Sequence, residues 1–204
     1  MNYLKYLTEE IHSTVMATVD KKGFPVTCAI YIMDYDENGL YFLTAKGKNF
    51  YARLKHGGYV SLTGTKGTDT LSCVAISVRG KVEEVGSDYL NRLFEKNSYM
   101  YEIYPTKESH TALTVFRIYD GCGEWFNLSK KPVERASFSF GNGIKKVDGF
   151  YVTDTCISCK KCVAVCPQGC IDFTSGYARI IQTSCLHCGN CLNICPEKAV
   201  VKRG

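Results

Sequence analysis

Two copies of one cysteine pattern constrain this chain more than any other feature of its sequence. Both copies read C-x2-C-x2-C-x3-C-P, and they occupy Cys156–Pro167 and Cys185–Pro196. The chain has 12 cysteines among 204 residues, and eight of them belong to this repeat. In a reducing compartment, cysteines in such numbers and at such regular spacing favour metal binding over disulfides.

The spacing is typical of the bacterial ferredoxin run. There, each pattern supplies three cysteines to one 4Fe–4S cluster and its fourth cysteine to the other cluster. The sequence therefore predicts two clusters with crossed ligation. Cluster one is expected to take Cys156, Cys159, Cys162 and Cys195, and cluster two Cys185, Cys188, Cys191 and Cys166. The alternative metal is zinc, which prefers two cysteine pairs separated by a longer loop and fits this pattern badly.

Two residues near the repeat remain outside this ligand set. Cys170 lies four residues after Cys166, and it is either a spare ligand or, as we favour, a small buried apolar residue. His187 lies inside the second pattern and is expected at the surface, because the cysteine set is complete without it. The roughly 57 residues of this part contain few large side chains, so its folding should depend on metal.

Composition and charge exclude several classes of protein. Hydrophobic residues make up 45% of the chain, which is enough for a core, and no run approaches the 18 apolar residues of a membrane span. The opening residues lack the apolar stretch of a signal peptide, so we expect a cytoplasmic location. The formal charge of +5 divides into +3 for residues 1–147 (19 basic, 16 acidic) and +2 for residues 148–204 (6 basic, 4 acidic). Neither part has a basic stripe dense enough for nucleic acid.

The first 147 residues read as short strands joined by tight turns. Strands are expected at 15–19, 24–33, 40–44, 59–63, 73–85, 113–119 and 124–128, with short helices at 2–12, 48–55 and 87–95. This order favours an antiparallel barrel or sandwich. A glycine-containing link near residues 141–146 precedes the cysteine-rich part, so we expect one domain at 1–147 and a second at 148–204.

Three segments of the first domain carry a resemblance to a known family. They are Val15–Pro25, Leu40–Phe50 and Tyr59–Gly64. Together they make residues 5–140 resemble the pyridoxamine 5′-phosphate oxidase-like proteins, the FMN-binding split barrels. The fold class expected for the whole chain is mainly β, an antiparallel split β-barrel with short helices, plus a small α+β two-cluster ferredoxin-like domain.

The resemblance implies FMN at a dimer interface. A helix that starts near Lys48 directly after a strand presents free amides and positive charge to an anion. The expected FMN contacts are Cys28, Ala29, Ile30, Thr44, Ala45, Lys46, Lys48 and Asn49. The oxidase's phosphate-binding Arg-Lys pair falls on Asn49 and Phe50, and its first FMN arginine falls on Cys28. The binding of FMN is therefore expected to depend on Lys46 and Lys48. Pyridoxamine phosphate is not the expected substrate. The alternative is a barrel without a ligand.

Two redox modules in one chain predict electron transfer between the 4Fe–4S clusters and FMN, with reduction of a small-molecule substrate in anaerobic metabolism. The alternative is a pure electron carrier between protein partners. The expected electron donor is a redox protein partner, with NAD(P)H as the alternative, because no dinucleotide-binding fingerprint is present. Trp125 could stack on flavin, although core packing is favoured, and no residue is assigned a catalytic role.

Overall fold

A computed structural model describes residues 1–145 and 148–204 of the chain. The expected end of the first domain, at residue 147, lies outside the described residues. The chain divides into two compact units. The first comprises residues 1–66, 75–124 and 138–145, and the second comprises residues 67–74, 125–137 and 146–204.

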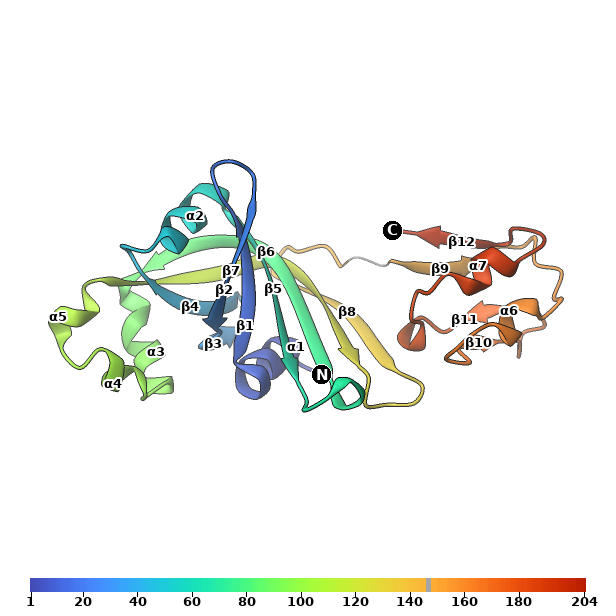
Figure 1. Cartoon of the computed structure of the whole chain (residues 1–204), viewed down its shortest axis with the longest axis horizontal. Coiled ribbons are helices and arrows are strands. Elements are labelled where there is room, and N and C mark those ends of the chain that lie inside the picture. The colour runs from blue at the N-terminus through green and yellow to red at the C-terminus, as the bar shows by residue number, and fades with distance from the viewer. Residues whose placement is uncertain (146–147) are drawn as a thin grey trace. The chain divides into compact units, whose positions relative to one another are not determined.

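An antiparallel sheet of eight strands dominates the fold (Figure 1). The strand order is β2-β1-β5-β6-β7-β4-β3, and β8 pairs with β7. The strands are β1 Ser13–Val19, β2 Pro25–Tyr31, β3 Asp34–Asp36, β4 Gly39–Ala45, β5 Tyr59–Lys66, β6 Val74–Gly86, β7 Leu113–Asn127 and β8 Glu134–Phe140. Short helices join them, namely α1 Tyr3–Tyr6, α2 Asn49–Gly57, α3 Leu90–Lys96, α4 Met100–Ile103 and α5 Lys107–His110. The mainly β fold class expected from the sequence is confirmed.

The sheet alternates between buried and exposed side chains, as a half-buried antiparallel sheet should. On β1, Thr14, Met16 and Thr18 are buried, and the residues between them face outward. Asp20 closes the β1–β2 hairpin, because its carboxylate accepts hydrogen bonds from the backbone amides of Lys22 and Phe24 at 2.8 and 2.9 Å. Aspartate is common in such turns because its side chain bonds to backbone amides that follow it.

One strand prediction is wrong. Residues 113–119 and 124–128 were expected as two strands separated by Gly121-Cys122-Gly123, but they form the continuous strand β7. A Cβ at Gly121 would lie 2.3 Å from Cζ of Phe140, and one at Gly123 would lie 2.4 Å from Cζ of Phe138. The two glycines therefore make room for the aromatic rings of β8 and do not end the strand.

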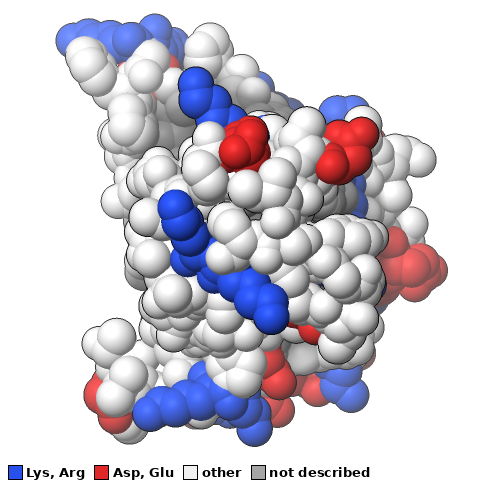
Figure 2. All heavy atoms as spheres, turned by 90° about the vertical axis from the view of Figure 1, so that its right-hand side faces the viewer, with Lys and Arg blue, Asp and Glu red and all other residues white. Residues whose placement is uncertain are grey.

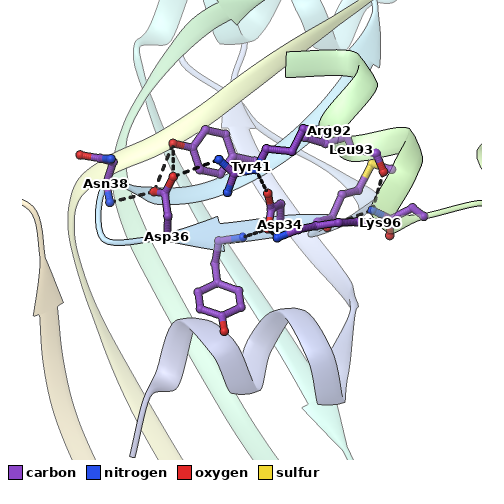
Figure 3. A network of polar contacts seen from close by, with 10 residues as sticks. Asp34, Asp36, Asn38, Tyr41, Arg92, Leu93 and Lys96 are labelled. Atoms are coloured by element: carbon purple, nitrogen blue, oxygen red, sulfur yellow. Dashed lines mark hydrogen bonds and ion pairs between the residues drawn. The ribbon is translucent and has the colours of Figure 1, made fainter. Parts of the chain in front are cut away.

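A polar network attaches α3 to the sheet (Figure 3). The carboxylate of Asp34 is 1% exposed and accepts hydrogen bonds from Arg92 and Lys96 of α3. Asp36 accepts a hydrogen bond from the hydroxyl of Tyr41, 3.0 Å away. Burial and the contact with Asp36 raise the pKa of Tyr41 to about 12, so this hydroxyl stays protonated and donates. Leu90, Leu93 and Phe94 of α3 pack on the apolar core beside this network.

The cysteine-rich part is built from two similar halves. Strands β9 (Gly149–Val152) and β12 (Val200–Arg203) pair, and so do β10 (Ile171–Asp172) and β11 (Arg179–Ile180). Helix α6 (Lys161–Ala164) and helix α7 (Asn190–Ile194) each begin inside one cysteine pattern. Among the described residues, no helix has the length and apolar character needed to cross a membrane.

Candidate functional site

The structure gathers the repeat cysteines into two cavities. Cavity one is lined by Cys156, Cys159, Cys162 and Cys195. Cavity two is lined by Cys185, Cys188, Cys191 and Cys166. These two groups are the same sets that the sequence analysis assigned to clusters one and two.

Backbone amides point at several of these sulfur atoms. The amide of Ala199 donates to Sγ of Cys195 at 3.3 Å, and the amide of His187 donates to Sγ of Cys185 at 3.4 Å. Burial alone would raise the pKa of Cys166, but backbone amides at residues 168–170 lower it below its usual value. Such donors stabilise thiolate, the form in which cysteine binds iron.

Each cavity brings together as many predicted ligands as a 4Fe–4S cluster takes. Across residues 1–145 and 148–204, no group of three or more His, Cys, Asp or Glu side chains is arranged to hold one metal ion. The 4Fe–4S group has four iron atoms that each take one thiolate, so the four predicted ligands around each cavity match its ligand count.

A fifth thiol lies against cavity two. Cys170 is 4% exposed and lines this cavity, and its Sγ lies 3.5 Å from Sγ of Cys166. Burial, followed by the contact with Cys166, raises the pKa of Cys170 well above its usual range. The expectation of a buried residue is thus correct. In the first half of the repeat the residue four positions after the last cysteine is Cys170, and in the second half it is Ala199.

Segment 125–137 contacts the loops around cavity two, within the same compact unit. The amide of Val133 donates to Oε1 of Gln168 at 2.9 Å, and Nη1 of Arg135 donates to the carbonyl of Cys185 at 3.3 Å. Trp125, at the start of this segment, is half-buried on β7. The sequence indicated neither of these contacts.

The residues expected to hold FMN lie on three elements of the barrel, β2, β4 and the start of α2. Cys28, Ala29 and Ile30 lie on the edge strand β2, Thr44 and Ala45 end β4, and Lys46, Lys48 and Asn49 lead into α2. Thr44 is 3% exposed, and Nζ of Lys46 donates to the carbonyl of Thr111 at 3.4 Å. Lys48 is the N-cap residue of α2 and has an extended backbone.

A groove runs between the β1–β2 hairpin and α2. Its lining residues are Val19, Asp20, Lys21, Lys22, Val26, Asn49, Ala52, Arg53 and His56. Of the expected FMN contacts, only Asn49 lines this groove. Burial raises the pKa of Cys28, and the positive charges of Arg53 and Lys48 partly offset that rise. The charges of both cations are therefore felt at Cys28 on β2.

Arg53 is the groove residue that the sequence analysis missed. Its Nε donates to Oγ1 of Thr18 at 2.8 Å, and its guanidinium lies 5.9 Å from the centroid of the Phe50 ring. These contacts orient the side chain. One signal in the sequence could have found it, because Arg53 lies four residues after Asn49 and therefore on the same face of α2.

Comparison with known proteins decides the family. The model of the pyridoxamine 5′-phosphate oxidase family matches residues 3–119, which is more than half of the chain. The chain belongs to this family. A model of the 4Fe–4S dicluster domain matches residues 155–199. The pyridoxamine 5′-phosphate oxidase-like barrel is thus joined to a two-cluster ferredoxin-type domain, and this combination indicates redox electron transfer.

Solved structures share the fold of the barrel at low sequence identity. A NimC/NimA family protein from Clostridium acetobutylicum is 16% identical with a TM-score of 0.56, and covers 68% of this chain and 90% of its own. A protein of the same organism related to general stress protein 26 is 17% identical with a TM-score of 0.51, with coverage of 66% and 90%. PhzG from Burkholderia lata, solved with tetrahydrophenazine-1-carboxylic acid, is 14% identical with a TM-score of 0.51, with coverage of 68% and 81%. A comparison with curated proteins found no match.

Proposed function

We propose that this chain is an iron–sulfur flavoprotein that transfers electrons between two 4Fe–4S clusters and FMN and reduces a small-molecule substrate. The observation that carries the proposal is the presence of two cysteine-lined cavities, each with four predicted ligands, in one chain with a barrel of an FMN-binding family. The clusters would supply one-electron transfer, and FMN would couple one-electron to two-electron chemistry. Residues 1–147 would form the flavin domain, and residues 148–204 would form the cluster domain.

The cysteines would hold the clusters with the crossed ligation predicted above. Each cavity draws its fourth cysteine from the other repeat, so each cluster would tie the two halves of this domain together. The buried core here is small and contains cysteines itself, including Cys170, Cys185 and Cys191. Cluster binding would therefore contribute a large share of the folding free energy of this domain.

Arg53 would supply the phosphate contact that the replaced Arg-Lys pair cannot. It lines a groove that follows α2 from Asn49 to His56, and its charge reaches Cys28 on β2 together with that of Lys48. A guanidinium is suited to phosphate because it offers paired donors in a fixed plane. The isoalloxazine ring would lie along Cys28, Ala29 and Ile30, with Thr44, Ala45 and Lys46 beside it, as the family resemblance implies.

A second copy of the chain would complete the flavin site. The outward face of β1, β2 and β5 exposes large apolar side chains, including Val15 at 56%, Tyr31 at 57% and Tyr59 at 50%. Val15 pairs with Ala29 of β2 and with Thr63 of β5, so these outward residues form one continuous face. A face of this kind in a family whose members are often dimers supports a homodimer with FMN at its interface.

The expected location is the cytoplasm, where thiol ligands stay reduced, and the oxygen sensitivity of such clusters suits anaerobic metabolism. The donor would be a redox protein or NAD(P)H.

Anaerobic reconstitution followed by acid release of the flavin tests the proposal. We expect two clusters and one FMN per chain. Full iron and sulfide without flavin would leave a ferredoxin joined to an empty barrel. Bound flavin that no small molecule reoxidises would favour a pure electron carrier.

A further inference from the structure

The two cysteine repeats differ in charge between their second and third cysteines. Lys160 and Lys161 stand in the first repeat where Gly189 and Asn190 stand in the second. Lys160 and Gly189 share a left-handed backbone, with φ, ψ of 60°, 5° and 81°, −2°. Glycine adopts this conformation freely, whereas a residue with a Cβ is strained in it. The first repeat keeps a lysine where the fold favours glycine, and this points to a role outside folding.

Both lysines are exposed and line cavity one. Nζ of Lys160 lies 5.8 Å from the centroid of the Phe173 ring, and within the described part of the chain neither lysine forms an ion pair. Glu197 is the carboxylate in the same lining. Figure 2, which looks toward the side of Figure 1 that carries the cysteine-rich part, shows Lys and Arg side chains in a row on a largely uncharged face.

An exposed apolar residue and an exposed ligand lie beside these charges. Ile157, also in the lining of cavity one, is 61% exposed, compared with 36% for Leu186 at the same position of the second repeat. Cys159 is exposed as well. An apolar centre with a charged rim is the usual composition of a transient protein interface.

The charges around the two cavities are unequal. A 4Fe–4S group with four thiolates carries about −2, and this charge repels an acidic partner. The ammonium groups of Lys160 and Lys161 offset it at cavity one. Among the described residues that line cavity two, none is charged; Arg135 contacts the carbonyl of Cys185 beside this cavity but is not in its lining.

We propose that Lys160, Lys161 and Ile157 form the docking surface for an acidic redox protein of the ferredoxin or flavodoxin class, and that this partner delivers electrons at cavity one. The inference rests on the proposed function and specifies its donor. In each encounter one electron leaves the reduced cofactor of the partner, which is oxidised by one electron, and this chain is reduced by one. No bond forms or breaks. The lysines accelerate the encounter through long-range attraction, which salt screens.

The test replaces the lysines with the residues of the second repeat, Lys160→Gly and Lys161→Asn together. The fold tolerates these residues at the equivalent positions, so the variant should fold and load iron normally. The control makes the same exchange at the exposed pair Lys130 and Lys131, between β7 and β8, with the same loss of net charge. Stopped-flow measurements would follow reduction of each anaerobically loaded chain by an acidic flavodoxin, and complex formation would be measured at several salt concentrations.

We expect the first variant to associate roughly tenfold more slowly at low salt, with a flatter salt dependence, and the control to stay within about twofold of the parent chain. Equal rates for the parent and the first variant would overturn the proposal. An equal loss in the control would also overturn it, because net charge alone would then explain the effect. Flavin content is measured separately. If the flavodoxin docked to a chain that binds no flavin, the proposed function would be refuted and the proposed docking surface would still be supported.

Discussion

Arg53 is the residue on which the proposed flavin site depends most. Its side chain is held by Thr18 and Phe50, so it reaches the groove beside α2 with little freedom left to lose when an anion binds. Lys55, two residues further along α2, pairs with Glu84 at 3.0 Å and does not line the groove. Arg53 and Lys55 therefore lie on the same helix, but only Arg53 lines the groove.

Replacement of Arg53 by Met should weaken FMN binding roughly ten- to hundredfold, because a hydrogen bond to a charged group contributes about 1.5–3 kcal/mol. Lys55→Met is the matched control and should leave FMN affinity unchanged. Quenching of flavin fluorescence during titration gives both affinities, and a thermal melt checks that each variant folds. Equal affinities for the Arg53 variant and the parent chain would exclude Arg53 from the site.

Cys170 is a side chain by which the two cluster cavities differ. Its thiol lies 3.5 Å from the sulfur of Cys166, at the position that Ala199 fills in the other half. A neutral thiol that donates toward a ligand sulfur favours the more negative, reduced state of the bound group. The apolar residue expected from the sequence is therefore also a polar neighbour of the cluster.

Cys170→Ala should keep the full iron content and lower the reduction potential of cluster two. A redox titration followed by electron paramagnetic resonance measures this shift, and Ala199→Cys should raise the potential of cluster one in the same experiment. If Cys170→Ala lost a cluster, the cysteine would be a ligand and the predicted ligand set would be wrong.

At the scale of elements, α3 depends on the buried carboxylate of Asp34. Asp34→Asn keeps the shape of the side chain and removes the charge that Arg92 and Lys96 contact. Both cations are partly exposed and can turn to water, so we expect a loss of about 2–3 kcal/mol of unfolding free energy. Glu10→Gln, at an exposed pair with Lys66, should have no measurable effect in the same urea titration. Equal stabilities of the two variants would show that the network does not hold α3.

The contact between β7 and β8 depends on glycine. Gly121→Ala places a methyl group 2.3 Å from the ring of Phe140 and 2.7 Å from the backbone oxygen of Arg79, and overpacking of this kind costs about 1–3 kcal/mol. Gly57→Ala, where a Cβ meets nothing within 4 Å, should be neutral or slightly stabilising. Calorimetric melts of both variants compare them directly. A neutral Gly121→Ala would mean that β8 packs differently.

At the scale of the whole molecule, the sequence predicts the cysteine-rich part better than the barrel. The cysteine spacing matches the bacterial ferredoxin run, and this match led to the two groups that line the cavities. The barrel strands follow hydrophobic alternation, so most were predicted. Strand β8 was missed, and β7 was divided, because the reason for Gly121 and Gly123 lies in the rings of Phe138 and Phe140 on another strand.

The groove between the β1–β2 hairpin and α2 shows the same limit of prediction from local sequence. The prediction relied on residues at the start of α2, where amides and lysines suit an anion. Of the expected FMN contacts, Asn49 is the one that lines the groove. Arg53 was missed because its importance comes from the β1–β2 hairpin, which folds back over α2 and supplies Thr18. Contacts between elements distant in sequence leave no local pattern to read.

Stepwise reduction of the fully loaded chain shows whether electrons pass between the clusters and FMN. One-electron equivalents are added anaerobically while flavin absorbance and cluster absorbance are recorded together. We expect electrons delivered by a protein donor to the clusters to bleach the flavin within the same mixing experiment, and a flavin reoxidant to restore both signals. A flavin that stays oxidised while the clusters are fully reduced, at potentials low enough to reduce FMN, would contradict this expectation.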